Sequence, residues 1–423
     1  MYHSRGLRMD YLPTELLDQI FGEFGYEDWK RFRLVCKTFA NVCAKYLTHT
    51  CTFSTTKDGL RKLEHMSMHP AFSTCIDMLI FDCSLLINFS DEHDFHSRLR
   101  FCNESPEQSQ RQFITYRPLL EAQNTIISTE EDANIFEAAI PRFSKLQALR
   151  IYMGSLEIGG RQQKEDFARI STHVPYYAIR QSASCSIRQF MMLMDILFRH
   201  NIRVSVLEVG PLTFSVFRQN LDLVQNVFSS LKQLVFYVSA LEDMPWPQQP
   251  PLTFFGSQSF CDVIGNGRAL NLLSAASQLA HLSVSVEYSP SGKDANFKDL
   301  FGNHTWPCLK RLSIGYMSAS ETDLVDFLRR HKLKELSIRS INLQGSWITA
   351  LPAMREAASP SLSSALAYEW ITNDTNETWY LGRHPSKPVV GRGDESSLGL
   401  HVAYYLTGAP SDFPCPLTLD NMS

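Results

Sequence analysis

Residues 309–338 read LKRLSIGYMSASETDLVDFLRRHKLKELSI and carry the pattern on which the fold prediction depends. The stretch opens and closes on the same six-residue motif, which reads Leu309-x-x-Leu312-x-Ile314 and Leu333-x-x-Leu336-x-Ile338. The alternation within each copy predicts a short strand with one buried face. Between the copies, Ser320 and Asp323 form a capping box ahead of an apolar run that ends in cations. That middle part is therefore predicted to be a helix.

The same motif recurs along most of the chain. The other copies are Ile76-x-x-Leu79-x-Phe81, Leu146-x-x-Leu149-x-Ile151, Val204-x-x-Leu207-x-Val209, Leu231-x-x-Leu234-x-Phe236 and Leu279-x-x-Leu282-x-Val284. From Leu207 onward, the central leucines are 27, 48, 30 and 24 residues apart. Taken as one or two units each, these gaps correspond to a period of about 24–29 residues, within the range of leucine-rich repeats.

The repeated strand–helix alternation predicts an α/β fold. Units of this length build a solenoid, with strands on the concave side and helices outside. The central leucines are expected to stack as one buried column: Leu207, Leu234, Leu282, Leu312 and Leu336. The full consensus of leucine-rich repeats is absent, so these repeats would be degenerate. The alternative is an ordinary α/β domain whose strands begin with leucine.

The first fifty residues have a different pattern. Residues 12–24 read LPTELLDQIFGEF, with Pro13 suited to the first turn of a helix and apolar residues recurring on one face. Asp28 is expected to cap a second helix. The apolar face of that helix repeats at spacings of three and four: Trp29, Phe32, Cys36, Phe39, Cys43 and Tyr46. Two short amphipathic helices cannot bury their apolar faces alone, so a partner surface is expected.

This segment resembles an F-box. The elements that carry the resemblance are Leu12-Pro13, Glu15, Leu16-Leu17, Ile20-Phe21, Asp28-Trp29 and Leu34-Val35-Cys36-Lys37-Thr38-Phe39. Phe24 and Trp29 stand where leucine is usual in the family, which leaves the apolar pattern intact. The alternative is a generic helical hairpin at the start of a larger domain.

The resemblance implies a binding function. F-box helices dock on a Skp-type adaptor, which joins a cullin–RING scaffold, while the rest of the chain selects a protein for ubiquitination. By resemblance, eight residues are expected to contact the adaptor: Leu12, Pro13, Leu16, Ile20, Trp29, Leu34, Val35 and Cys36. Apolar anchors of this kind usually carry most of the affinity of an interface. The sequence leaves open which of them face the adaptor and which pack inside the F-box.

The whole chain is similar to F-box proteins with degenerate leucine-rich repeats that are common in filamentous fungi. The expected domains are an F-box at residues 9–50, a repeat region for the target at 51–357 and a loop-rich tail at 358–423. Aromatic residues in or beside the strands are candidate target contacts: Phe236, Tyr237, Tyr288 and Tyr316.

Composition narrows the function further. The 423 residues carry a net charge of −4, so no global positive field would hold a nucleic acid or an anionic membrane, and neither is an expected partner. The ten cysteines include no C-x-x-C pair that would indicate a structural zinc site. No signal peptide or membrane span is predicted, which favours a cytoplasmic or nuclear protein. No catalytic, cofactor-binding or metal-binding motif stands out.

Three functions remain as hypotheses from the sequence. The leading one is a substrate receptor of an SCF-type cullin–RING ubiquitin ligase, without catalysis or a cofactor of its own. The second is an F-box scaffold or regulatory protein that acts with the adaptor outside a ubiquitin ligase. The third is an enzyme whose site is assembled from distant residues.

Overall fold

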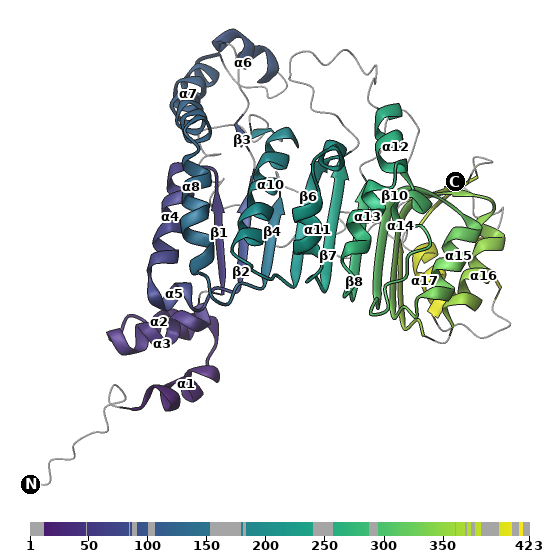
Figure 1. Ribbon diagram of the computed structural model, residues 1–423, viewed down its shortest axis with the longest axis horizontal. Helices are drawn as coiled ribbons and strands as arrows, with labels where there is room; N and C mark the ends of the chain where they lie inside the picture. Colours follow the sequence, from purple (N-terminus) through teal and green to yellow (C-terminus); the bar gives the residue numbers. More distant parts are fainter. Residues whose placement is uncertain are drawn as a thin grey trace, which may run out of the picture. The chain divides into compact units, whose positions relative to one another are not determined.

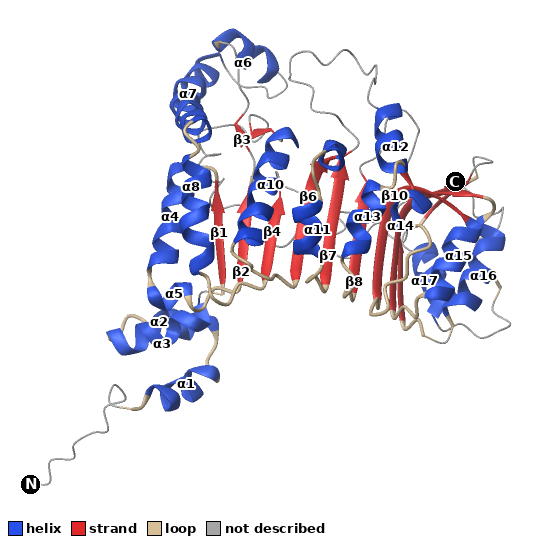
Figure 2. Ribbon diagram, viewed as in Figure 1, coloured by secondary structure: helices blue, strands red, loops and turns tan. Residues whose placement is uncertain are grey.

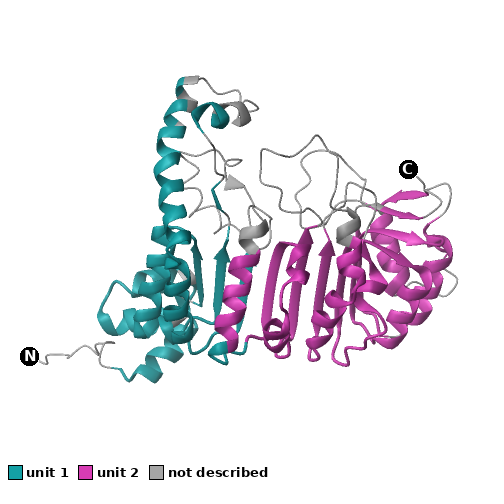
Figure 3. Ribbon diagram, turned by 45° about the horizontal axis from the view of Figure 1, so that its top comes forward, with its two compact units in different colours: residues 1–181, 199–203 teal, residues 182–198, 204–423 magenta. Residues whose placement is uncertain are grey.

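The chain folds into two compact units (Figure 3). The computed structural model describes residues 12–47, 49–83, 85–86, 91–99, 106–152, 179–180, 183–239, 257–286, 295–359, 361–368, 370–373, 377–381, 397–407 and 414–417. Unit 1 is Met1–Gln181 with Arg199–Arg203, and unit 2 is Ser182–Phe198 with Val204–Ser423. The contact pattern therefore groups the amino-terminal helices with the first strands of the expected repeat region.

Unit 1 begins with three helices and continues as alternating strands and helices (Figure 1). Its elements are α1 (Thr14–Gly22), α2 (Tyr26–Phe32), α3 (Lys37–Leu47), β1 (Thr50–Ser54), α4 (Lys57–Met68), α5 (Pro70–Ser73), β2 (Met78–Asp82), β3 (Leu85–Leu86), α6 (Glu92–Leu99), α7 (Pro106–Ser128), α8 (Glu131–Ala139), a 3-10 turn (Ile140–Arg142), β4 (Ala148–Tyr152) and β5 (Ile179–Arg180). Strands β1, β2 and β4 run parallel, whereas β3 and β5 form a small antiparallel pair.

Aromatic packing holds the helices of unit 1 on its sheet. The Phe53 and Phe81 rings stack at 4.9 Å on the neighbouring strands β1 and β2. Phe136 of α8 meets both rings edge-on, at 5.4 and 5.1 Å. At Gly59, the first turn of α4 passes so close to β1 that a Cβ would lie 2.5 Å from the Ser54 carbonyl oxygen. Glycine is therefore required there for α4 to pack directly against the strand.

Unit 2 continues the same alternation over more strands. Its elements are α10 (Ala183–Arg199), β6 (Val206–Thr213), a 3-10 helix (Phe214–Arg218), α11 (Asp222–Phe228), β7 (Gln233–Ser239), α12 (Ser257–Gly265), α13 (Arg268–Ala275), β8 (His281–Val286), β9 (Ala295–Asn296), α14 (Phe297–Phe301), β10 (Arg311–Ser320), α15 (Glu321–Arg330), β11 (Glu335–Gln344), α16 (Trp347–Ala358), β12 (Ser364–Tyr368), β13 (Trp370–Asn373), β14 (Thr378–Tyr380) and α17 (Ser397–Thr407).

The main strands of unit 2 lie side by side in the order in which they occur in the sequence. Strands β6, β7, β8, β10, β11 and β12 are parallel, and each pairs with the one before it. The helices that connect them lie on the same side of the strands (Figure 2). One face of the sheet lies against helices, so buried and half-exposed residues alternate along its strands. In β8, for example, Leu282, Val284 and Val286 are buried, and the residues between them are half-exposed.

The predicted leucine column is present. Leu207, Leu234, Leu282, Leu312 and Leu336 are paired in register across β6, β7, β8, β10 and β11. All five side chains are at most 4% exposed. In unit 1, Leu79 and Leu149 pair in the same way. The six-residue motif therefore predicted the position and the buried face of the strands that contain its seven copies.

The helix expected after Ser320 is also confirmed. It is α15, and the Ser320 hydroxyl oxygen accepts the backbone N–H of Asp323 at 3.1 Å. Four apolar residues on one face of α15 are buried: Leu324, Val325, Phe327 and Leu328. The capping box and the apolar spacing therefore determine where this helix starts and which side faces the sheet.

Residues 358–423 differ from the loop-rich tail that the sequence suggested. Their described parts hold β12, β13, β14 and α17, and β12 extends the parallel sheet beside β11. Gly399 in α17 lies so close to β12 that a Cβ would be 2.4 Å from the Ala367 carbonyl oxygen. This region therefore closes the sheet of unit 2. Among the described residues, no helix combines the length and hydropathy needed to cross a bilayer.

Candidate functional site: the amino-terminal helices

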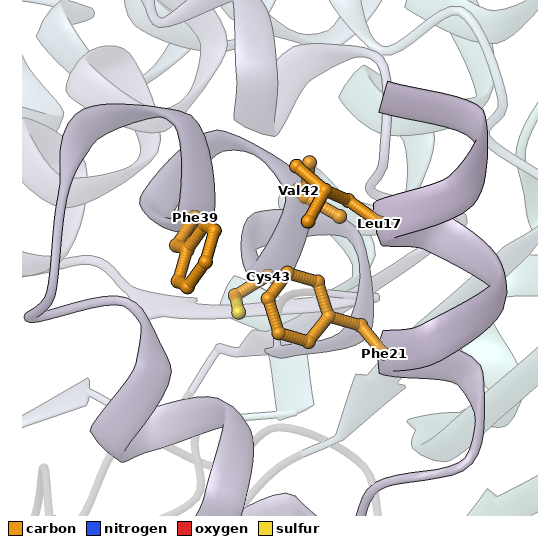
Figure 4. Close-up of a cluster of buried hydrophobic side chains, with 5 residues drawn as sticks. All are labelled: Leu17, Phe21, Phe39, Val42 and Cys43. Atoms are coloured by element: carbon orange, nitrogen blue, oxygen red, sulfur yellow. The ribbon is translucent and has the colours of Figure 1, made fainter. Parts of the chain in front are cut away.

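Helices α1 and α3 enclose a small hydrophobic core (Figure 4). Leu17 and Phe21 point into it from α1, and Phe39, Val42 and Cys43 point into it from α3. The Phe21 and Phe39 rings meet edge-on at 5.2 Å. Burial raises the pKa of the Cys43 thiol, so this side chain packs as a small hydrophobe and not as a reactive thiolate.

Helix α2 is attached to this core through Trp29. Its indole N–H donates to the Phe21 carbonyl oxygen at 2.7 Å, and its ring stacks on Tyr46 with the centroids 5.0 Å apart. The Tyr46 hydroxyl is also 2.7 Å from a carboxylate oxygen of Asp18. Trp29 therefore joins α2 to α1 and α3 and is half-buried inside the three-helix cluster.

A non-helical break at residues 33–36 separates α2 from α3, where one continuous second helix was expected. Gly25, and not Asp28, is the cap residue of α2, and Asp28 lies in its first turn. At the break, the Leu34 N–H donates to the Arg31 carbonyl oxygen at 3.1 Å, as in a tight turn. The Cys36 sulfur then accepts the Phe39 N–H at 3.5 Å, which gives α3 a weak cap.

The break presents two large apolar side chains to solvent. Leu34 is 79% exposed and Val35 is 65% exposed. Helix α1 presents a third, Leu16, which is 45% exposed. Covering aliphatic side chains of such exposure with a partner surface lowers the free energy, because their apolar surface is removed from water. Together with exposed Pro13, they form what we call the exposed apolar set: Pro13, Leu16, Leu34 and Val35.

The structure thus divides the eight residues that the resemblance had placed at the adaptor. The exposed apolar set contains four of them. The other four are half-buried, and three of these pack against the small core: Leu12, Trp29 and Cys36. Ile20 is the fourth half-buried residue. Apolar spacing alone could not separate the two groups, because inward and outward side chains alternate within the same motif.

The sheet face of unit 2 opposite its helices is a second surface of interest. Three serines, Ser283, Ser313 and Ser337, are half-exposed and in register across β8, β10 and β11. Beside them, the Arg339 guanidinium lies over the Tyr316 ring at 4.5 Å and over the Tyr368 ring at 5.6 Å. This face is therefore polar and aromatic, whereas the opposite face forms the core.

The candidate target contacts from the sequence differ in how far the structure exposes them. Tyr237 and Tyr316 are half-exposed, whereas Phe236 is 1% exposed and belongs to the core, so its assignment was wrong. Phe236 alternates with Tyr237 along β7, and only one of two neighbours can face the helices. Tyr288 lies outside the described residues. Among the described residues, no three potential metal-ligating side chains lie together.

Comparison with known families identifies the amino-terminal module. Residues 9–48 match the family model described as F-box domain. The chain carries an F-box domain. The match spans α1, α2 and α3, including the break that exposes Leu34 and Val35. No curated protein matches the chain.

Proposed function

We propose that this F-box protein is the substrate-recognition subunit of an SCF-type cullin–RING ubiquitin ligase. In this proposal the F-box binds a Skp-type adaptor, and the sheet-bearing remainder of the chain, as a degenerate leucine-rich-repeat solenoid, binds the target. The protein would then contribute no catalytic group of its own. Its function would be to hold the target beside an enzyme that the adaptor and the cullin bring.

The observation that carries the proposal is the exposure of Leu34 and Val35 within the F-box. Full burial of a leucine or valine side chain typically contributes about 1.5–3 kcal/mol. The F-box core leaves both residues outside, because Phe39, Val42 and Cys43 already fill the space between α1 and α3. A partner surface is therefore the means by which these two side chains can become buried.

The target-binding part of the proposal is supported by the sheet of unit 2. Its strands follow one another with helices on one side, so the opposite face is an extended surface. Half-exposed tyrosines on that face, Tyr237 and Tyr316, suit an interface because they combine large apolar rings with a polar group.

The test is capture of a purified Skp-type adaptor by the full-length chain. Replacing both exposed residues at the break, Leu34→Asp with Val35→Asp, should abolish capture, because two charges would have to be desolvated at the centre of the interface. The matched control is Ile114→Asp with Leu400→Asp, two apolar residues of similar exposure, 64% and 60%, outside the F-box. The control should capture the adaptor at wild-type strength.

Wild-type capture by the Leu34→Asp/Val35→Asp variant would contradict the adaptor-binding assignment. Co-elution of a cullin with the complex of adaptor and wild-type chain would distinguish a ligase receptor from a scaffold that uses the adaptor alone. A scaffold would hold the adaptor in a complex from which the cullin is excluded.

A further inference from the structure

Strands β10 and β11 share a backbone irregularity beside the Arg339 side chain. Tyr316 and Ser340 have left-handed backbone conformations, with φ of 55° and 45°. They lie at the same level of the two strands, because Gly315 and Arg339, the residues that precede them, are paired in register. The left-handed region is unfavourable for residues other than glycine, and strained residues concentrate at binding and active sites. This level of the sheet is therefore a candidate for ligand binding.

The irregularity places Tyr316 on the same face of the sheet as Arg339. Leu312 and Ile314 of β10 are buried in the core, and strict alternation would bury Tyr316 as the next member of that series. Instead Tyr316 is half-exposed, and the residue after it, Met317, is 0% exposed. The Tyr316 ring therefore stays on the exposed face, where the Arg339 guanidinium lies 4.5 Å from its centroid.

This arginine belongs to a row of residues that crosses five neighbouring strands. In order, the row is Tyr237 of β7, Ser285 of β8, Gly315 of β10, Arg339 of β11 and Tyr368 of β12. Gly315 contributes no side chain, and a Cβ there would lie 3.0 Å from the Ser285 hydroxyl oxygen. The Arg339 guanidinium also lies 5.6 Å from the centroid of the Tyr368 ring. The row thus has an aromatic ring at each end and polar side chains on both sides of the glycine.

The charges of these five strands favour an anionic ligand. The strands contain two arginines, Arg311 and Arg339, and one acidic residue, Glu335, which gives a net charge of +1 with His281 neutral. Arg311 and Glu335 form an ion pair at 2.9 Å. A guanidinium that stacks on aromatic rings is held in a fixed orientation, and its planar donors match a carboxylate. Arg339 is therefore oriented in advance for an anionic group.

We propose that Arg339 binds an aspartate or glutamate side chain of an acidic segment of the target, and that the tyrosines beside it pack on the neighbouring target residues. The inference rests on the proposed function, because it names the chemical class that the target-binding face accepts. One arginine beyond the Arg311–Glu335 pair matches the single charge of a carboxylate. A phosphate group carries nearly two charges and is typically bound by a cluster of arginines, so a carboxylate fits better.

The experiment selects short random peptides, displayed on phage, on the full-length chain. The wild type should enrich peptides that carry Asp or Glu at one fixed position. A synthetic peptide of the selected sequence should bind Arg339→Gln about tenfold or more weakly, because charge-assisted hydrogen bonds are lost. Replacing the acidic residue of the peptide by its amide should weaken wild-type binding by a similar factor. The same replacement should not weaken binding to Arg339→Gln further, since the two groups act as a pair.

Further variants separate the stacked guanidinium from charge alone. Arg339→Lys retains the charge but loses the planar donors, so binding should fall by an intermediate factor. Tyr316→Ala should also weaken binding, whereas Tyr316→Phe retains the ring that orients Arg339. The matched control is Lys334→Gln, which removes an exposed positive charge directly before β11 and should bind the peptide at wild-type strength. Thermal melting of each variant would show that it is folded.

A selection without a fixed acidic position, or equal binding of the acidic peptide by Arg339→Gln and the wild type, would overturn the carboxylate site. Equal weakening by Lys334→Gln would also overturn it, because net charge would then explain the effect. Tighter binding of the same peptide with phosphoserine at the acidic position would assign the site to phosphorylated targets instead. Every variant should still capture the Skp-type adaptor, so these outcomes leave the adaptor-binding assignment standing. A wild-type chain that selects acidic peptides but captures no adaptor would contradict the proposed function alone.

Discussion

His331 is a buried histidine that must stay neutral. Its Nε2 lies 3.0 Å from the Trp306 backbone N–H, which can only donate, so Nε2 is the unprotonated acceptor. Its Nδ1 then carries the proton and donates to the Phe327 carbonyl oxygen at 2.9 Å. The ring also stacks on Phe327 at 4.0 Å. A second proton on Nε2 would face the Trp306 N–H, so protonation opposes the folded state.

We therefore expect unit 2 to lose stability in mild acid. Burial lowers the pKa of His331 below its usual value of about 6.5 in unfolded chains. Below that pH the unfolded chain binds the proton and the folded chain does not. The free energy of unfolding therefore has its full value above about pH 6.5, and it decreases as the pH falls until the pKa of the folded state is reached. The slope is at most about 1.4 kcal/mol per pH unit for each such proton.

Urea unfolding followed by tryptophan fluorescence at pH 7.5, 6.5 and 5.5 would measure this effect, because Trp306, Trp347 and Trp379 are buried in unit 2. His331→Leu should lower stability at pH 7.5 and reduce the pH slope. Burial also lowers the pKa of His304, so part of the slope should remain. A slope unchanged by His331→Leu would show that this ring is not the group that titrates.

At the scale of elements, the in-register leucines make each strand depend on its neighbours. Leu312 of β10 is paired with Leu282 of β8 on one side and with Leu336 of β11 on the other. A cavity at its position would therefore remove contacts from three strands. Ser313, the next residue, points to the opposite face and is half-exposed.

Leu312→Ala is expected to destabilise unit 2 by about 2–5 kcal/mol, the usual cost of truncating a buried leucine. Ser313→Ala is the matched control and should change stability by less than about 0.5 kcal/mol. Thermal melting followed by tryptophan fluorescence would show the difference. If both variants melted like the wild type, the column would not contribute to the core as the burial of Leu312 indicates.

The sequence predicted these strands well because their signal is simple. An aliphatic residue, a leucine and a further apolar residue at fixed spacing are enough to mark a strand with one buried face. The break after Phe32 carried no such signal, since neither proline nor glycine interrupts residues 33–36. Leu34 and Val35 continue the apolar composition of a helix, and only tertiary structure shows that they are exposed. For the same reason, the exposed apolar set could not be selected from the eight predicted contacts.

At the scale of the whole chain, the carboxy-terminal region has a structural role. Strand β12 covers the edge of β11, and α17 packs on β12. The sequence did not predict these elements, because the strands of this region are short and neighbouring residues, such as 382–393, are rich in glycine and proline. An uncovered parallel edge would present free backbone N–H and C=O groups to other chains.

Removing residues 360–423 should therefore lower the melting temperature of unit 2 and promote association through the freed edge of β11. Size-exclusion chromatography with light scattering would detect the association, and thermal melting would detect the loss of stability. Binding of the adaptor should persist, because the F-box lies at the other end of the chain. A truncated protein that stays monomeric and melts like the full chain would contradict the closing role of β12 and α17.

The strand order of unit 2 also has a consequence for biosynthesis. Each parallel strand pairs with the one synthesised just before it, so none has to wait for a distant segment to leave the ribosome. Chains are made at about 5–20 residues per second, which gives each strand seconds to dock before the next one emerges. Until β12 is synthesised, the growing sheet always ends in an unpaired edge. The edge of β11 is therefore open to misassembly during translation of residues 345–368, after β11 is complete and while β12 is still being made.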